Sequence, residues 1–255
     1  MNYRDVFKRY EIKYLITDSQ REEIDRALAE NAVHDQFGVT SVRNIYYDTP
    51  DFRLIRRSLE KPVYKEKLRV RAYGSPKKDG EVFVELKKKY KSVTYKRRIK
   101  TTDDIASRWI CDKNPPFGSQ IAREINYALN YYGSLSPAVQ ISYDREAFVG
   151  VRERDFRITF DKNILWRAED LSLSGGVYGK AILPEGYTLM ELKTPAAFPL
   201  WFTEILTKCK LYSTHFSKYG NAYLALSGEY KPEFEADIAK GKVICPASKG
   251  EIIYA

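Results

Sequence analysis

The sequence predicts an α+β fold: a closed, mainly antiparallel eight-stranded β-barrel with helices packed outside. Eight segments alternate apolar and polar side chains with the period of two that is typical of strands. Four segments with helical apolar spacing interrupt them, and the charged side chains of several strands share one face. Eight strands are enough to close a barrel. A chain of 255 residues with 44% hydrophobic side chains can bury a sizeable core.

The predicted strands extend over most of the chain. Side chains at i and i+2 lie on the same face of a strand, so each segment has an apolar face and a polar or charged one. A turn formed by residues 74–80, with a glycine at each end, separates the third segment from the fourth. In chain order the segments are Lys8–Ile16, Val42–Tyr47, Tyr64–Tyr73, Glu81–Lys89, Val93–Lys100, Val139–Val149, Phe156–Asp161 and Thr188–Lys193.

Four helices are predicted outside the barrel. The first begins at Asp18, where Glu22 can complete a capping box, and its apolar stripe includes Ile24 and Leu28. The second is expected to stop at Gly133. After the first helix, the others are expected at Gln120–Tyr132, Pro199–Cys209 and Ser217–Leu226.

One domain is the simplest organisation, because the sequence has no internal repeat, low-complexity tract or composition change that marks a linker. We expect residues 1–230 to form the barrel domain. Residues 231–255 are expected to form a polar tail, for which the sequence predicts no packing. No apolar run approaches the roughly 20 residues needed to cross a bilayer, and the polar start has no signal-peptide character. We therefore expect a cytoplasmic protein.

The third predicted strand has a row of cations on one face. Lys65, Lys67, Arg69 and Arg71 occupy this face, whereas Leu68 lies on the other. A solvated surface would explain a charged face on any single strand. However, four like charges side by side repel one another, and contact with solvent alone gives no reason to place them together. Since the chain also has a net charge of +9, we expect an anion to lie along this row.

Carboxylates share these charged faces. Glu11, Glu85 and Glu191 each alternate with basic residues along their strands. A site for an anion alone has no need of them, whereas magnesium typically takes one or two protein carboxylates and completes its shell with water and phosphate oxygens. Moving these charges into a dry interior would cost several kcal/mol per ion. The charged faces should therefore line a wet tunnel, with the apolar faces outward against the helices.

Several other classes of site are excluded by the sequence. The chain has two histidines, His34 and His215, and no Ser-His-Asp, Cys-His or zinc-ligand spacing. It also lacks the Gly-x-x-x-x-Gly-Lys-Ser/Thr loop of P-loop enzymes. Rows of cations with a metal ion remain, and they suit phosphoryl transfer, because that reaction needs positioning and charge neutralisation more than covalent help.

Seven sequence blocks, in the same order, resemble the vacuolar transporter chaperone domain in its bacterial form. This is the polyphosphate polymerase branch of the triphosphate tunnel metalloenzymes. The resemblance extends over roughly residues 4–226. The blocks are Arg9–Tyr14, Ile45–Pro50, Lys67–Gly74, Val84–Lys87, Ser142–Phe148, Met190–Lys193 and Phe216–Tyr219.

The resemblance and the charged faces together give a predicted site. The resemblance implies that the transferred phosphate contacts Arg69, Arg71, Lys87 and Arg145, and that a manganese or magnesium ion binds mainly at Glu191. The charged faces add Glu11 and Glu85 as further metal ligands. The remaining phosphate-binding residues are expected to be Arg9, Lys13, Lys67, Lys96, Arg98, Lys193 and Lys218.

The function implied by the resemblance is polyphosphate synthesis from ATP inside the tunnel. Two alternatives stay open: hydrolysis of triphosphate or polyphosphate, and non-catalytic polyphosphate binding by a sensor or accessory subunit. An RNA-binding module ranks third, because strong basic charge with many tyrosines is compatible with it. We expect ATP, polyphosphate or triphosphate as ligands and no nucleic acid. A membrane-protein partner, which would hold the chain at the inner face of the membrane, is a further expectation from the resemblance.

Overall fold

The computed structural model describes residues 10–76, 80–91, 93–195 and 197–229, so Arg9 and the predicted tail lie outside the described residues. All eight predicted strands are present, together with two short ones. The strands are β1 (Tyr10–Thr17), β2 (Ala32–His34), β3 (Thr40–Asp48), β4 (Tyr64–Tyr73), β5 (Glu81–Tyr90), β6 (Val93–Thr102), β7 (Ser136–Gly150), β8 (Arg157–Arg167), β9 (Lys180–Ala181) and β10 (Tyr187–Thr194). The helices are α1 (Asp18–Asn31), α2 (Arg53–Leu59), α3 (Asp103–Asp112), α4 (Gln120–Tyr132), α5 (Leu200–Lys208) and α6 (Lys218–Leu226).

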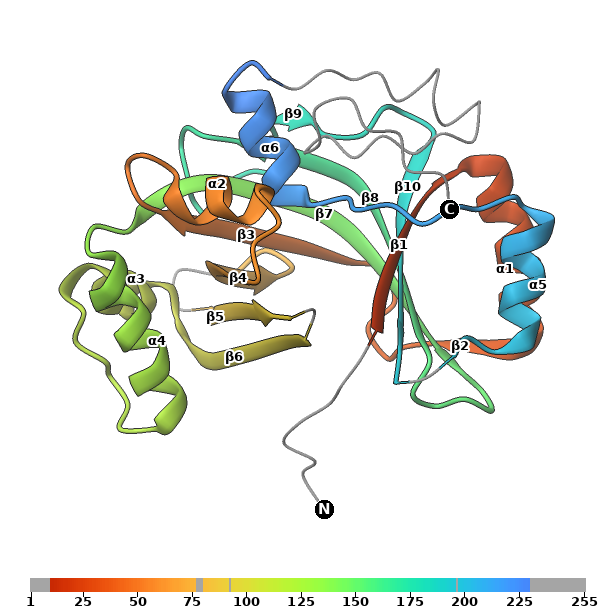
Figure 1. The fold of residues 1–255 in the computed structure, drawn as a ribbon, viewed down its shortest axis with the longest axis horizontal. Helices are drawn as coiled ribbons and strands as arrows, with labels where there is room; N and C mark the ends of the chain where they lie inside the picture. The colour runs from red at the N-terminus through yellow and green to blue at the C-terminus, as the bar shows by residue number, and fades with distance from the viewer. Residues whose placement is uncertain (1–9, 77–79, 92, 196, 230–255) are drawn as a thin grey trace.

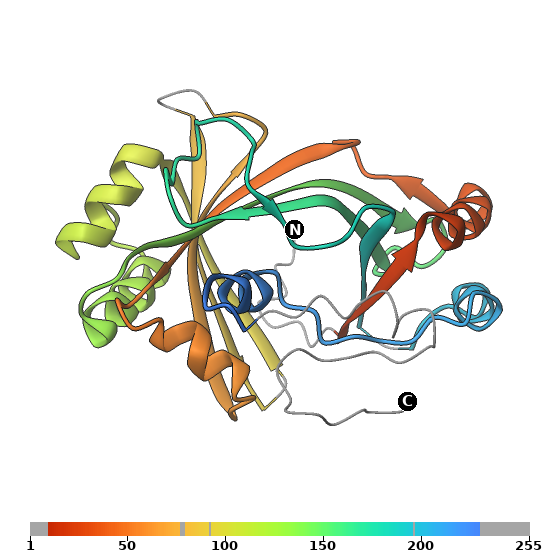
Figure 2. The same ribbon diagram turned by 90° about the horizontal axis from the view of Figure 1, so that it is seen from above.

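The strands form one antiparallel sheet in the order β1-β10-β8-β7-β3-β4-β5-β6, and β2 and β9 pair with β7 and β8. The sheet is strongly curved, so that its two end strands, β1 and β6, lie on either side of an opening (Figure 1). Seen from above, α3 and α4 lie at one end of the molecule, α1 and α5 at the other, and α6 between them (Figure 2). The predicted α+β class is confirmed.

The predicted closure of the barrel is wrong: among the described residues, no hydrogen-bonded ladder joins β1 to β6. Another segment takes the free edge of β1, because the Thr214 amide donates to the carbonyl of Lys13 at 2.7 Å. The chain then enters the opening, where Lys13 donates to the Phe216 carbonyl at 3.0 Å and Lys67 to the Ser217 hydroxyl at 2.9 Å. Residues 214–217 therefore contact strands on both sides of the gap.

Two apolar clusters cover the outer face of the sheet, as the alternation predicted. At one end, side chains of β4 and β5 such as Leu68 and Val84 pack with Trp109 of α3 and Ile125 of α4. At the other end, strands β1, β8 and β10 pack against α1 and α5, with Phe202 as a central residue. Burying apolar side chains of this size contributes about 1.5–3 kcal/mol each, so these helices hold the curvature of the sheet from outside.

A third apolar cluster lies on the inner face, where the sequence analysis expected only charge. Leu15 follows Lys13 by two residues and Leu189 precedes Glu191 by two, so each leucine shares a face with its charged neighbour. Both leucines pack with Tyr219 of α6. The inner surface is therefore divided: one end is filled by α6 and apolar side chains, and charged side chains occupy the rest. This cluster fixes α6 inside the curve of the sheet.

The helix ends explain two differences from the predicted elements. The capping box of α1 uses Thr17 and Gln20, one position before the predicted Asp18. Helix α2 was not predicted, because no conventional cap precedes it: Phe52 has a left-handed backbone with φ of 56°. Its first amides bind instead to the side chain of Asp48, which accepts from Leu54 at 2.8 Å and from Ile55 at 3.0 Å. None of the helices in the described residues is long and apolar enough to span a membrane.

Candidate functional site

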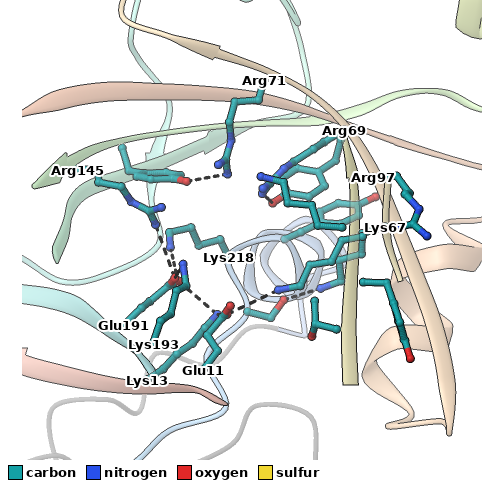
Figure 3. A pocket seen from close by; sticks show the side chains of 18 of the residues that line it. Glu11, Lys13, Lys67, Arg69, Arg71, Arg97, Arg145, Glu191, Lys193 and Lys218 are labelled. Atoms are coloured by element: carbon teal, nitrogen blue, oxygen red, sulfur yellow. Dashed lines mark hydrogen bonds and ion pairs between the residues drawn. The ribbon is translucent and has the colours of Figure 1, made fainter. Parts of the chain in front are cut away.

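The inner face of the sheet holds a charged cavity of about 420 Å³ (Figure 3). Its walls come from β1, β3, β4, β5, β6, β7 and β10 and from the start of α6. The basic lining residues are Lys13, Lys67, Arg69, Arg71, Lys87, Lys96, Arg97, Arg145, Lys193 and Lys218, and the acidic ones are Glu11 and Glu191. Of the predicted site residues that the structure describes, all but Arg98 and Glu85 line this cavity.

Strand pairing sets much of the arrangement. Lys13 of β1 lies opposite Glu191 of β10, which brings an acid and a base together. In contrast, Lys87 of β5 lies opposite Lys67 on one side and Lys96 on the other. Directly opposed like charges destabilise a sheet. The register of β4, β5 and β6 therefore creates a concentration of positive charge that a bound anion would relieve.

Glu191 is the central carboxylate of the cavity. One of its oxygens lies 3.2 Å from Lys218 and 3.5 Å from Lys13, and the other lies 3.7 Å from both Arg145 and Lys193. Burial alone would raise the pKa of Glu191, but the surrounding cations outweigh burial and hold the pKa well below its usual range. Glu191 is thus ionised and attracts four cations to one point.

Asp161 of β8 lies behind this group and is completely buried. Its carboxylate accepts two hydrogen bonds from Arg145, at 2.6 and 2.7 Å, and one from Lys218 at 2.5 Å. Burial favours a higher pKa for Asp161, but the charges of Lys218 and Arg145 lower it. Bidentate Arg–carboxylate pairs fix geometry as well as charge. Asp161 therefore positions two of the cavity cations without lining the cavity itself.

Glu11 lies at the opening of the sheet. Its carboxylate is 3.6 Å from Lys87 of β5 and 3.8 Å from Lys13, so side chains connect β1 to β5 where no backbone ladder does. Burial acts to raise the pKa of Glu11, but Lys87 and the other neighbouring lysines lower it to about 2. Glu11 is therefore ionised and faces the cavity beside lysines of β1, β5 and β10.

Glu85 has a different environment from the other two predicted metal ligands. Its carboxylate is 1% exposed and lies 2.6 Å from Lys96, 2.7 Å from Arg69, 3.2 Å from Arg98 and 3.9 Å from Arg71. Glu85 and Arg98 are absent from the cavity lining. Both oxygens of Glu85 are already engaged by cations, so its geometry is that of a buried anchor for the arginines of β4.

Lys67 lies among cations. Its ammonium donates to Ser217 at 2.9 Å, and in the described residues it has no carboxylate partner. Burial, followed by the charges of Lys87 and Lys13, lowers the pKa of Lys67 well below its usual range. Burial also lowers the pKa of Lys96, to about 8. Lys67 and Lys96 are therefore less readily protonated than ordinary lysines, and a bound anion would raise their pKa values.

Four of the residues that the sequence analysis missed accept hydrogen bonds from cavity cations. Tyr143 accepts a hydrogen bond from Arg71 at 3.1 Å, and the hydroxyl of Tyr46 accepts one from Arg69 at 3.0 Å. Ser217 and Asp161 are the others. A signal existed for two of them: Tyr143 shares the face of Arg145, and Asp161 ends the alternating run Arg157–Asp161. Tyr46 and Ser217 lie in blocks of the resemblance but gave no charge pattern.

A divalent metal would find only part of its ligands in the protein. Within the described ranges, no group of three His, Cys, Asp or Glu side chains is arranged to hold a metal ion. The carboxylates that face the cavity, Glu191 and Glu11, are both ionised hard oxygen ligands. Magnesium and manganese accept such a set when phosphate oxygens and water supply the rest. These two residues therefore fit a metal that arrives together with a phosphorylated ligand.

Solved structures with a similar fold support the architecture. A candidate adenylate cyclase from Bacillus halodurans aligns with a TM-score of 0.50 and 13% identity, over 84% of this chain and 94% of that one. A candidate adenylyl cyclase from Hippeastrum, described as having a dominant triphosphatase activity, aligns with a TM-score of 0.50 and 14% identity, over 88% of this chain and 98% of that one. At such identities the likeness extends to the fold alone.

Sequence comparison is more specific. A search of curated proteins finds no match. The family model for the VTC domain, however, matches residues 8–227, which include every strand and helix and the whole lining of the cavity. The resemblance noted in the sequence is therefore confirmed over most of the chain, and the chain belongs to the VTC domain family.

Proposed function

We propose that this protein catalyses metal-dependent phosphoryl transfer on a triphosphate or polyphosphate chain in the charged cavity, with polyphosphate synthesis from ATP as the reaction. The observation that carries the proposal is the lining of the cavity of about 420 Å³: nine basic side chains of the inner face line it with two carboxylates, and among the described residues only two further carboxylates, Glu85 and Asp161, lie behind them. The tenth basic lining residue, Arg97, is bound to Glu124 on the outer face. Without a ligand, this excess of buried positive charge is unfavourable. A chain with one negative charge or more on each phosphate would neutralise it.

The arrangement of the cations suggests a division of roles. Arg69 and Arg71 are held by Glu85, and Arg145 is held by Asp161, so their planar guanidiniums are fixed before a ligand arrives. Fixed donors that neutralise developing charge are the main source of catalysis in phosphoryl transfer. We assign these arginines, together with Lys87, to the transferred phosphate.

The remaining lysines would hold the rest of the chain. Lys13, Lys193 and Lys218 surround Glu191, and Lys67 and Lys96 lie on the far wall. Lysine ammonium groups bind phosphate oxygens as point charges and tolerate several ligand positions. This suits a site through which successive phosphates of a chain move.

Glu191 and Glu11 would hold the metal ion, which supplies additional charge neutralisation at the phosphate oxygens when it is bound. The ionised state of both carboxylates favours this role. Glu191 also distinguishes an enzyme from a simple anion binder. A carboxylate among phosphates repels them, so a metal ion between the two would give Glu191 a use beyond positioning the four cations around it.

Hydrolysis is the second candidate. The Hippeastrum protein of similar fold is described as a triphosphatase, and water could attack a terminal phosphate held by the same residues. The cavity does not separate the two acceptors, because both reactions require the same neutralisation of the transferred phosphate.

Product analysis tests the proposal. The purified protein is incubated with ATP and magnesium or manganese, polyphosphate is detected on gels, and released orthophosphate is measured. Metal-dependent polyphosphate formation is the expected result. Orthophosphate release without polyphosphate would establish the hydrolase instead. Absence of turnover with ATP, triphosphate and polyphosphate, with magnesium, manganese and cobalt, would leave a phosphate-binding protein without catalysis.

A further inference from the structure

A second group of buried cations lies outside the cavity, on the outer face of the sheet. Arg43 of β3 and Arg167 at the end of β8 are 7% and 8% exposed. Arg43 alternates with Asn44 and Tyr46, whose side chains contact the cavity arginines on the inner face. Gln140 of β7 pairs with Arg167 and is 2% exposed. All three side chains form hydrogen bonds with the connection between β8 and β9, residues 168–179.

Both guanidiniums hold this connection by its backbone. They donate to carbonyl oxygens over distances of 2.5–3.1 Å. The acceptors are the carbonyls of Leu173 and Gly175 for Arg43, and those of Asp170, Gly176 and Tyr178 for Arg167. The end of the connection is fixed as well, because a Cβ on Gly179 would lie 2.4 Å from the carbonyl oxygen of Trp166. Residues 168–179 are thus a fixed cover over two positive charges.

These charges lack a counter-ion among the described residues. In the part of the chain that the structure describes, no carboxylate makes an ion pair with Arg43 or Arg167. The nearby carboxylate of Asp170 accepts the hydroxyl of Tyr178, whose ring stacks on Arg167 at 4.1 Å. Burial, and then the charge of Arg167, lowers the pKa of Arg43. Two buried like charges therefore lie close enough to repel each other.

Three donors of the same group are buried and have no acceptor among the residues that the structure describes: Nε of Arg43, Nη2 of Arg167 and Nε2 of Gln140. Buried polar groups are nearly always hydrogen-bonded, and an unsatisfied donor on a charged group is the most costly kind. A water molecule could accept from these donors, but it would leave the charge of both arginines uncompensated. An anion satisfies the donors and the charge together.

We propose that a small inorganic anion, chloride or orthophosphate, binds beneath residues 168–179, between Arg43, Gln140 and Arg167. The anion would fasten this connection to β3 and β7. The connection continues into β9 and then β10, the strand that carries Glu191. The site is separate from the charged cavity, since none of its three residues lines the cavity, and it does not depend on the proposed phosphoryl transfer.

Thermal unfolding at constant ionic strength tests the site. Chloride or orthophosphate replaces gluconate in the buffer, and the melting temperatures of the native protein and three variants are compared. Arg43→Met removes the site, Lys87→Met alters the cavity, and Arg154→Met removes an exposed arginine elsewhere. We expect one of the two anions to raise the melting temperatures of the native protein, Lys87→Met and Arg154→Met by about 2 °C or more beyond any rise in Arg43→Met, in which only the cavity is left to bind an anion. The effective anion identifies the ligand.

The opposite results would overturn the proposal. These are the absence of a shift in the native protein, an equal shift in Arg43→Met, or a shift that only Lys87→Met loses, which would place the anion in the cavity. Should Arg43→Met fail to fold, crystals of the native protein soaked in bromide, and separately in arsenate, decide the question. An anomalous peak beside Nε of Arg43 and Nη2 of Arg167 supports the site, and a peak in neither soak excludes it.

Discussion

Lys87 is the cavity lysine whose removal should disturb the packing least. Its side chain is 42% exposed, and its ammonium forms an ion pair with Glu11 at 3.6 Å. Lys87→Met should therefore fold normally and bind tripolyphosphate more weakly. Loss of one charge-assisted phosphate contact costs about 1.5–3 kcal/mol, which corresponds to a dissociation constant at least about tenfold higher. Isothermal titration measures it.

The matched control is Lys88→Met. Lys88 follows Lys87 on β5 but lies on the outer face, where its ammonium is 3.9 Å from Glu124 of α4. Its removal should leave tripolyphosphate affinity unchanged. Equal weakening in both variants would mean that general surface charge, and not the cavity, attracts the ligand.

The alternation of side chains along the strands predicted most of the charged residues that line the cavity. Period-two alternation places Lys67, Arg69 and Arg71 on one face, and the structure brings them together with Lys13 and Glu191 from distant strands. It could not separate Glu85 from the other two glutamates. All three lie on the charged face of their strands. Only the place of each strand in the curved sheet determines that Glu11 and Glu191 face the cavity while Glu85 lies beneath the arginines.

Helix α6 supplies the element-scale prediction. The hydroxyl of Tyr219 donates to Asp48 at 2.9 Å, and its ring stacks on Tyr46 at 4.5 Å, so α6 is tied both to the cap of α2 and to β3. Tyr219→Phe removes a hydrogen bond to a buried carboxylate, which should cost about 1–3 kcal/mol of unfolding free energy. Urea denaturation measures the loss.

Tyr223→Phe, one turn further along α6, is the control. Its ring packs on Phe52, and we expect a change within about 0.5 kcal/mol. If Tyr219→Phe were as stable as this control, then the contact with Asp48 would contribute nothing to holding α6. Lys218 is the first residue of α6, so another contact would then have to hold it in the cavity.

Most elements were predicted where a hydrophobic period or a helix cap marks them, whereas helices α2 and α3 and the open sheet were not predicted. All eight strands came from alternation, and α4 ends at Gly133 as expected. Whether the barrel closes depends on which partner reaches the edge of β1. The Thr214 amide takes that edge, and nothing in the local sequence around Thr214 indicates a strand. Helix α2 was missed because its cap, Asp48, lies five residues before its first residue.

The stability of the whole molecule should respond to pH through the cavity lysines. Burial lowers the pKa of Lys67 and Lys87, and that of Lys96 to about 8, whereas all three titrate at the ordinary value of 10.5 when unfolded. The unfolded chain then binds more protons than the native one, so unfolding free energy should rise between about pH 7 and about pH 9. Denaturation at several pH values measures the slope.

Tripolyphosphate should remove this slope. A bound anion favours the charged lysines and raises their pKa values, so the native protein no longer binds fewer protons than the unfolded chain. The same denaturation series with saturating tripolyphosphate is the comparison. A slope that is flat without the ligand, or unchanged with it, would show that these lysines are not the groups that meet the phosphates.

The most direct test of the account uses Glu191→Gln, which keeps the shape of the side chain and removes its charge. Metal-dependent turnover of ATP, measured as polyphosphate or orthophosphate formed, should be lost in this variant. Its affinity for tripolyphosphate should be retained or increased, because the basic residues remain and a repelling carboxylate is gone. Turnover at the native rate in Glu191→Gln would contradict the metal-assisted mechanism at this site.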